Sequence, residues 1–246
     1  MSQYVKTTAL SINRYDYSET SQVVKFFSPE LGAFNTLAKG AKRDKNTIGG
    51  PLDILHLYEI TFIRKPSECL NILTGSEIIN PFLPIRQDIE KFNASSRMLL
   101  LINELLPFHA KNSEVFELCL NALANICLGS KPQIDLLYFE LHLLRLLGHI
   151  PQISSCVMCS EPLETQFART NFSASSGGIL CRACAGKIPE KLETPTGVFT
   201  FFDSMLNNRI TKFDRIVLAG GLHPETRRIL NYYFSYVIEK PVCNYA

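Results

Sequence analysis

The sequence predicts an α+β protein, in which an N-terminal five-stranded barrel is followed by a helical domain with an inserted four-cysteine module. Three observations lead to this fold class. Short apolar stretches separated by turn residues fill residues 1–80, the apolar repeat becomes helical from about residue 85, and two Cys-x-x-Cys pairs interrupt the helical part. The change of period near Pro81 and Pro84 divides the chain into a domain at residues 1–80 and a domain at residues 81–246.

Five strands are expected in the first domain, at residues 5–14, 22–27, 33–38, 54–63 and 69–74. Strands of this length and spacing favour a small closed or half-closed barrel. Residues 28–32 form the turn between the second and third strands, with Pro29 early in it and Gly32 where φ is positive. Residues 54–63 are apolar on both faces for most of their length, which predicts a central strand.

A basic segment follows the third expected strand. Four of the seven residues 39–45 are Lys or Arg, and aromatic side chains lie on the neighbouring strands. A five-stranded barrel with a basic loop and aromatics is the pattern of an OB-fold, which binds single strands through base stacking and backbone charge. The alternatives are a solvated loop without a ligand, and aromatics that mostly fill the barrel core. The aromatics in question are Tyr15, Tyr17, Phe26, Phe27, Phe34 and Tyr58.

Helices are expected at residues 86–109, 114–128, 134–148, 195–207 and 223–239. In the third of them Glu140 points away from the polar face, so we expect a buried carboxylate that a neighbouring basic or backbone group satisfies. A loose basic tract near the C-terminus is interpreted first as a solvated helix face. Its members are Arg209, Lys212, Arg215, Arg227 and Arg228.

The four-cysteine module spans about residues 151–190. Cys156 and Cys159 form one Cys-x-x-Cys knuckle, and Cys181 and Cys184 form the other. Two facing knuckles supply four thiolates for one tetrahedral Zn²⁺ per chain, and a site closed by four sulfurs has a structural role because no position is left for water. Gly177 and Gly178 can take the positive φ of a tight return towards the metal. Two disulfides or a thioredoxin-like redox pair are the competing interpretations.

Composition narrows the class of protein further. The chain has 246 residues and 46% hydrophobic content, which is enough to form hydrophobic cores. Its formal net charge is only +2, so an acidic partner would have to bind a local basic patch. No export signal and no stretch long enough to span a membrane is expected, so we predict a cytoplasmic, non-membrane protein. The sequence lacks a phosphate-loop motif, and it lacks the His-x-Glu that a zinc deaminase needs beside its cysteines, so we expect neither nucleotide consumption nor zinc-deaminase chemistry.

Several short motifs occur in a specific order. Ala38-Lys39-Gly40-Ala41-Lys42-Arg43 lies in the barrel, and Leu147-Gly148-His149-Ile150-Pro151 directly precedes the cysteines. The remaining motifs lie at residues 17–20, 31–32, 103–107, 139–144, 172–173 and 177–181. With this order of motifs, the chain resembles the bacterial DNA repair protein RecO family of recombination mediators over nearly its whole length. It departs from the pattern after Lys45, where residues 46–50 carry no cation.

The resemblance implies an N-terminal OB-fold, a helical domain with a structural zinc module, and no catalytic residues. It implies a nucleoid-associated protein that binds single- and double-stranded DNA, anneals complementary strands, and acts with RecR and the C-terminal tail of single-stranded DNA-binding protein, so that RecA loads on coated strands. Lys39, Lys42 and Arg43 match the family's basic motif, and the four cysteines match its zinc ligands. Arg14 and Lys45 are added to the DNA-binding set from their positions.

The family's site for the single-stranded DNA-binding protein tail lies around the helix that contains residues 139–141. Such an acidic peptide with a hydrophobic end needs an apolar pocket with a cation at its mouth, and Arg145 with Leu141 and Leu144 is the local candidate. The alternative function is a protein-interaction scaffold whose zinc module docks repair partners without direct DNA binding.

Overall fold

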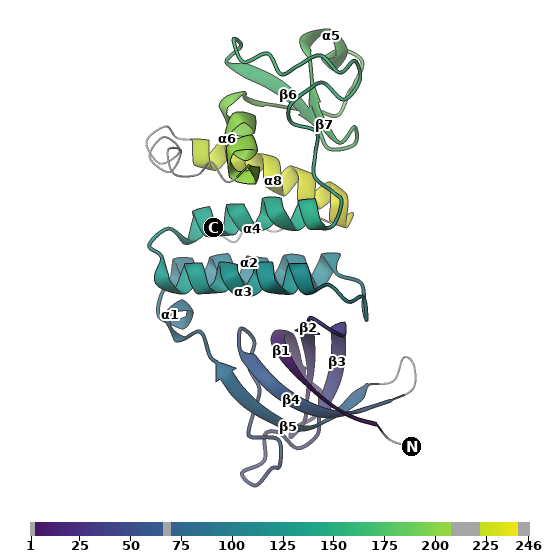
Figure 1. The fold of residues 1–246 in the computed structure, drawn as a ribbon, viewed down its shortest axis with the longest axis vertical. Coiled ribbons are helices and arrows are strands. Elements are labelled where there is room, and N and C mark those ends of the chain that lie inside the picture. Colours follow the sequence, from purple (N-terminus) through teal and green to yellow (C-terminus); the bar gives the residue numbers. More distant parts are fainter. Residues whose placement is uncertain (1–2, 66–69, 208–221, 241–246) are drawn as a thin grey trace. The chain divides into compact units, whose positions relative to one another are not determined.

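The structure, a computed structural model, describes residues 3–65, 70–207 and 222–240 (Figure 1). The chain divides into two compact units, residues 1–139 and 140–246, and each is described separately below. The domain boundary that the sequence predicts at residue 80 lies within the first unit and stays a prediction. Among the described residues, no helix is both long and apolar enough to cross a membrane.

Five strands of the first unit close into a barrel with the order β1-β2-β3-β5-β4 (Figure 1). Their bounds are β1 Gln3–Asp16, β2 Gln22–Ser28, β3 Gly32–Ala38, β4 Leu57–Arg64 and β5 Asn71–Asn80. All neighbours pair antiparallel except β3 and β5, which pair in parallel through Thr36 with Asn71 and Leu37 with Ile72. The predicted five-stranded barrel is confirmed.

The barrel interior is filled by alternate residues of the strands. Phe26, Phe34, Tyr58, Ile60 and Phe62 belong to one buried cluster inside it. Phe34 lies between Phe26 and Phe62, with ring centroids 6.2 and 5.1 Å away. Phe27 points the other way and meets Phe116 at 5.5 Å. Most of the aromatics considered for base stacking are therefore core residues. This agrees with the alternative in which the aromatics mostly fill the barrel core.

The fourth strand begins later than its apolar pattern predicts. Leu55 has φ of 57° and its N–H donates to the Ser11 carbonyl, so residues 54–56 turn before β4 starts at Leu57. Leu55 is nevertheless fully buried. A buried turn keeps the same apolar composition as a strand, which is why the alternation continues through it.

Helices complete the first unit. Asp88 caps α2 (Ile89–Leu105) by accepting from the N–H groups of Glu90 and Lys91, and Asn112 caps α3 (Ser113–Leu128). The short α1 (Leu83–Arg86) precedes them. Within this unit α2 packs against β1 and α3 against β2, and Lys25 Nζ of β2 donates to Asn103 Oδ1 of α2 at 2.9 Å. The barrel therefore has a helical layer of its own.

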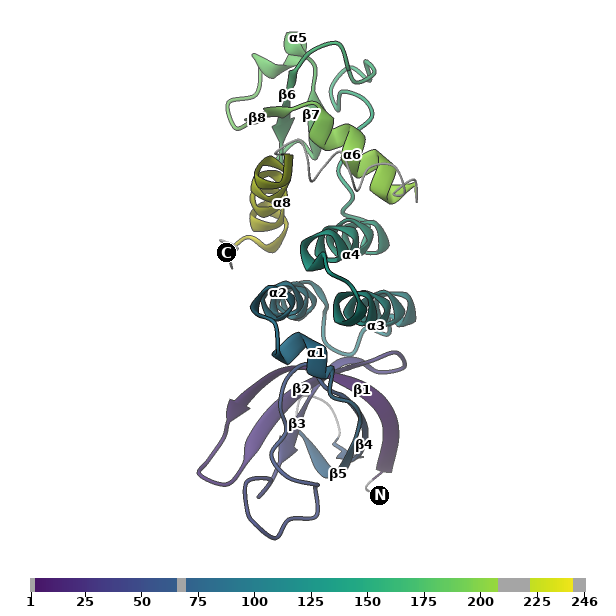
Figure 2. The same ribbon diagram turned by 90° about the vertical axis from the view of Figure 1, so that its left-hand side faces the viewer.

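Helix α4 (Pro132–Leu146) crosses the division between the units, and the rest of the second unit follows it. A three-stranded antiparallel sheet has the order β7-β6-β8, with β6 Arg169–Ser173, β7 Gly178–Leu180 and β8 Leu192–Pro195. Figure 2 shows this sheet close to α6 (Gly197–Leu206) and α8 (Leu222–Ile238), and α8 contacts both β8 and α6. Phe172 of β6 stacks on Phe199 of α6 at 5.7 Å. The short helix α5 (Arg182–Ala185) lies between β7 and β8.

Glu140 is fully buried, and Arg227 of α8 pairs with it. The expected buried and satisfied carboxylate is confirmed. Of the predicted basic tract, Arg209, Lys212 and Arg215 lie outside the described residues, and Arg228 pairs with Glu225 at 3.1 Å.

Candidate metal centre and nucleic-acid interface

The four cysteines of the module converge on one point. The sulfurs of Cys156, Cys159, Cys181 and Cys184 all lie within 4.8 Å of one another, and Cys159 Sγ is 3.6 Å from Cys181 Sγ. A tetrahedral Zn²⁺ with bonds of about 2.3 Å separates its sulfurs by about 3.8 Å. The donor set and its spacing therefore fit one Zn²⁺. All four thiols are free in the structure, so the two-disulfide interpretation receives no support.

Backbone hydrogen bonds build each knuckle. The N–H of Ser160 donates to the Cys156 carbonyl, and the N–H groups of Cys184 and Ala185 donate to the Cys181 carbonyl. The N–H of Val157 donates to the Ile179 carbonyl at 3.0 Å, which joins the first knuckle to β7. The strand before the second pair of cysteines is thus bonded to the first pair, which explains how two distant sequence segments meet.

The two glycines at the start of β7 serve different purposes. Gly177 has φ of 78°, as the sequence predicts. Gly178 is needed for a close approach instead, since a Cβ at this position would lie 2.3 Å from the Gln152 carbonyl oxygen. Only glycine allows the two backbones to come this near.

The pKa values of two thiols in the cluster are shifted in opposite directions. Burial acts to raise the pKa of Cys156, but hydrogen bonds from the backbone N–H groups of Cys181, Met158 and Cys159 lower it to about 6. A hydrogen bond with the Cys181 side chain, and then one with Cys159, raises the pKa of Cys184 to about 12. Because Zn²⁺ binds thiolates, metal binding would release the protons that these thiols hold.

The basic segment, residues 39–45, forms an exposed turn after β3. Lys39, Arg43 and Lys45 are exposed, and Lys42 is half-buried because its ammonium pairs with Asp16 Oδ1 at 2.7 Å. This hydrogen bond with Lys42 lowers the pKa of Asp16. The segment thus holds three solvent-facing cations on one edge of the barrel, and a fourth cation that a carboxylate neutralises.

Arg14 does not share this arrangement. Its Nε donates to Asp53 Oδ1 at 3.0 Å, and Asp53 also pairs with Arg86 at 2.9 Å. Burial acts to raise the pKa of Asp53, but the Ile54 backbone N–H and then the two guanidinium groups lower it. Arg14 could therefore bind a phosphate only if the phosphate displaced Asp53 from the ion pair.

Two of the six aromatics considered for base stacking are not core residues. Tyr15 and Tyr17 are 53% and 61% exposed, whereas Phe26, Phe34 and Tyr58 are 3% exposed or less. Both tyrosines lie in a polar stretch, residues 13–19, that includes Arg14, Asp16 and Glu19. That charged context is the signal that separates them from the core aromatics.

The predicted tail-binding residues do not form an open pocket in the described structure. Leu141 and Leu144 are fully buried, while Arg145 is exposed and its Nη1 donates to the Leu206 carbonyl at 2.8 Å. A peptide would reach these leucines only after the surrounding side chains moved. The assignment stays a prediction.

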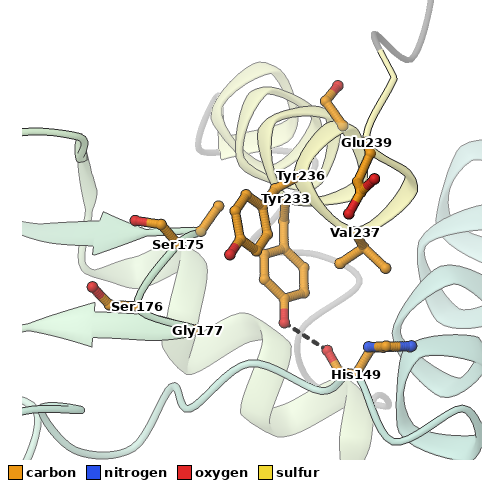
Figure 3. A pocket seen from close by; sticks show the side chains of 10 residues that line it. His149, Ser175, Ser176, Gly177, Tyr233, Tyr236, Val237 and Glu239 are labelled. Atoms are coloured by element: carbon orange, nitrogen blue, oxygen red, sulfur yellow. Dashed lines mark hydrogen bonds between the residues drawn. The ribbon is translucent and has the colours of Figure 1, made fainter.

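A pocket of ≈ 530 Å³ lies in the second unit between α8 and the loop before β7 (Figure 3). Tyr233 Oη donates to the His149 carbonyl at 2.8 Å across it. In Figure 3 the His149 ring points away from Ser175 and Ser176, so the pocket presents no serine activated by a histidine. Its lining does not form a nucleophile–base pair.

Comparison with known proteins assigns both parts of the chain to one family. The family model described as recombination protein O N terminal matches residues 1–82, and the one described as recombination protein O C terminal matches residues 86–245. A DNA repair protein RecO of Thermodesulfovibrio yellowstonii is 30% identical over 238 residues, which cover 94% of this chain and 93% of that protein.

Two further relatives carry the same name. The DNA repair protein RecO of Syntrophus aciditrophicus is 26% identical over 96% of this chain and 91% of its own length. That of Rhodopirellula baltica is 33% identical over 72% of this chain, and the match spans 65% of the Rhodopirellula protein. Together with the barrel, the four-cysteine centre and the two family models, these matches show that the chain belongs to the recombination protein O (RecO) family.

Proposed function

We propose that the chain is a DNA-binding recombination mediator that acts in DNA repair without catalytic residues. It binds single- and double-stranded DNA through the barrel, anneals complementary strands, and with RecR helps RecA load on strands coated by single-stranded DNA-binding protein. The relatives' shared name, DNA repair protein RecO, supports the repair role. Such a protein works on the nucleoid.

The main support for DNA binding is the exposed basic segment. Lys39, Arg43 and Lys45 are exposed on a closed five-stranded barrel, the architecture that binds single strands elsewhere. Each cation that meets a phosphate releases a condensed counterion, so binding gains free energy without a base-specific contact. Screening of phosphate repulsion between two strands is what annealing requires.

Zinc has a structural role in the proposal. Four sulfurs complete a tetrahedral shell and leave no position for water, so the ion would hold the module together and would not activate a nucleophile. The second unit then offers the surfaces for partner proteins, RecR and the tail of single-stranded DNA-binding protein among them.

Fluorescence anisotropy of a labelled single-stranded oligonucleotide, titrated over a range of salt concentrations, tests the proposal. In the variant with Lys39, Lys42 and Arg43 changed to Ala, we expect weaker binding and a slope of log K against log salt that is shallower by about 1.4, since each contact to a single strand contributes about 0.7 and Asp16 neutralises Lys42. A control variant changes the exposed Lys65, Lys111 and Lys131 to Ala, which alters the net charge equally.

The control variant should bind as the wild type does. An equal loss in both variants would show that bulk charge, and not the basic segment, drives binding. Absence of binding by the wild-type protein at low salt would overturn the proposal and leave the scaffold function as the alternative.

A further inference from the structure

We propose that Tyr15 and Tyr17 stack on unpaired bases of the strand whose phosphates the basic segment holds, so that this edge of the barrel prefers single-stranded DNA to duplex. The inference rests on the proposed DNA binding and deepens it, because it names the class of nucleic acid that the site prefers. The two tyrosines and residues 39–45 are called the hairpin edge below.

Exposure of the two rings is the first observation. Tyr15 and Tyr17 are 53% and 61% exposed, although the same barrel buries Tyr58 almost completely. An aromatic ring left in water forgoes the free energy of burial. Two such rings separated by one residue offer a surface for flat apolar groups, and nucleobases are groups of this kind.

The basic segment is bonded to the hairpin that carries these rings. Asp16, the residue between the two tyrosines, pairs with Lys42 Nζ at 2.7 Å. The Lys42 N–H donates to the Thr20 carbonyl at 3.1 Å, and the Gly40 N–H donates to Ser21 Oγ at 3.1 Å. Three bonds thus join the basic segment to the β1–β2 hairpin, which also carries the two tyrosines.

The hairpin itself is ordered by strand pairing. Pairing of β1 with β2 continues through Tyr15 with Val23 to Asp16 with Gln22, and the Tyr17 N–H donates to the Ser21 carbonyl at 2.9 Å. The tyrosines therefore lie on a paired backbone and not on a loose tail. This stretch of backbone therefore does not have to become ordered when a base stacks on the rings.

Stacking distinguishes single strands from duplexes. In a duplex the faces of the bases are covered by neighbouring base pairs, and only the phosphates and groove edges are accessible. The cations of the hairpin edge act on both forms, whereas the tyrosines act only on unpaired bases. Single-stranded DNA gains both contributions at this edge.

The test measures binding of a single-stranded oligonucleotide and of a hairpin duplex by the wild type and four variants. Changing Tyr15 and Tyr17 to Ala should weaken single-strand binding roughly tenfold or more, since one stacked base contributes about 1–3 kcal/mol. Duplex binding and both salt slopes should stay as in the wild type, because no charge is removed. The Y15F/Y17F variant keeps both rings and should bind single strands within about twofold of the wild type.

Tyr4 supplies the matched control. It is 67% exposed and lies near the opposite end of the same strand, where it pairs with Ile63. Changing Tyr4 to Ala should leave single-strand binding unchanged.

Tyrosine fluorescence gives a second readout. The chain has 9 Tyr and no Trp, so its intrinsic emission comes from tyrosine. Stacking on thymine should quench part of this emission when oligo(dT) is added. The Y15F/Y17F variant should lose that quenching while it keeps its affinity.

The outcomes separate this inference from the proposed function. Single-strand binding that survives Y15A/Y17A but is lost in the K39A/K42A/R43A variant would overturn stacking and leave DNA binding intact. Equal losses for single strand and duplex in Y15A/Y17A would also overturn it, since stacking would then not be the cause. A wild-type protein that binds neither DNA would overturn both.

Discussion

Arg227 Nη1 donates to both carboxylate oxygens of Glu140, at 2.8 and 2.7 Å, across 87 residues of sequence. The Glu140 side chain is fully buried, and that of Arg227 is 19% exposed. A buried carboxylate is tolerated because this cation neutralises it. The pair thus joins α8 to the end of α4 that belongs to the same unit.

Removal of one partner of this pair should destabilise the protein strongly. Arg227→Met leaves the Glu140 charge buried and uncompensated, at a cost of about 3–5 kcal/mol in the free energy of unfolding. Urea denaturation measures it. The neighbouring Arg228→Met is the control, because the Arg228–Glu225 pair is exposed and its loss should cost less than about 1 kcal/mol. Similar losses of unfolding free energy in Arg227→Met and Arg228→Met would contradict a special role of the buried Glu140–Arg227 pair.

Zinc removal should unfold the module around the cysteines. Its buried cluster consists of Cys156, Leu180, Cys184 and Ala185, which is too small a core to fold without the ion. With a chelator we expect new proteolytic cleavage within residues 151–195, and metal analysis should show about one zinc per untreated chain. The variant Cys159→Ser should lose bound zinc, whereas Cys127→Ser in α3 should keep it. A module that stays protease-resistant without metal would show that its core suffices.

Gly178→Ala should distort the approach of β7 to the first knuckle. The added Cβ would lie 2.3 Å from the Gln152 carbonyl oxygen, so the backbone must shift. We expect a loss of about 1–3 kcal/mol in unfolding free energy and weaker zinc retention. Gly186→Ala is the matched control in the same module, since its Cβ would meet nothing within 4 Å. Equal stability of the two variants would refute the steric argument.

Release of Lys42 from its carboxylate partner should strengthen DNA binding. Asp16→Asn removes the charge that pairs with Lys42 and lets the ammonium meet a phosphate. If the proposed function holds, affinity for a single strand should rise, and the salt slope should steepen by about 0.7. Anisotropy at several salt concentrations measures both. Glu30→Gln, which removes another acidic residue of the barrel, should have the smaller effect.

Acid should destabilise the second unit through His142. Burial, and then the nearby Arg145 charge, lower the pKa of His142, although a backbone hydrogen bond with Met205 acts in the opposite direction. The unfolded chain therefore takes up this proton first, and the stabilising contribution is lost as the pH falls below about 6.5, the ordinary histidine pKa. Unfolding free energies between pH 7.5 and 5 should depend less on pH in His142→Gln. An unchanged pH dependence would exclude His142 as its source.

Local sequence patterns predicted the strands and the cysteine cluster well. They could not predict which residues distant in sequence form ion pairs. The five strands and the four-cysteine cluster follow from alternation, turn residues and Cys-x-x-Cys spacing, all of which act over a few residues. The ion pair of Arg14 with Asp53 and that of Glu140 with Arg227 join residues 39 and 87 positions apart. No periodicity encodes such partners.

Exposure was the other quantity that the sequence left open. Phe26 and Tyr15 are both aromatic residues of the first hairpin, yet Phe26 lies inside the barrel and Tyr15 in solvent. Leu141 and Leu144 are apolar and could line a pocket, but both are fully buried in the packed structure. Chemical type defines what a side chain can bind, and only the folded arrangement decides whether it is accessible.

Closure of the barrel affects how copies of the protein meet. Every one of its five strands has a neighbour on both sides, because β1 pairs with β4 and β3 with β5. In the described residues, a closed order of this kind leaves less free strand edge, the row of N–H and C=O groups that can recruit a strand from another molecule, than an open sheet does. We therefore expect the barrel to resist the pairing of strand edges that open sheets allow when copies of a protein meet.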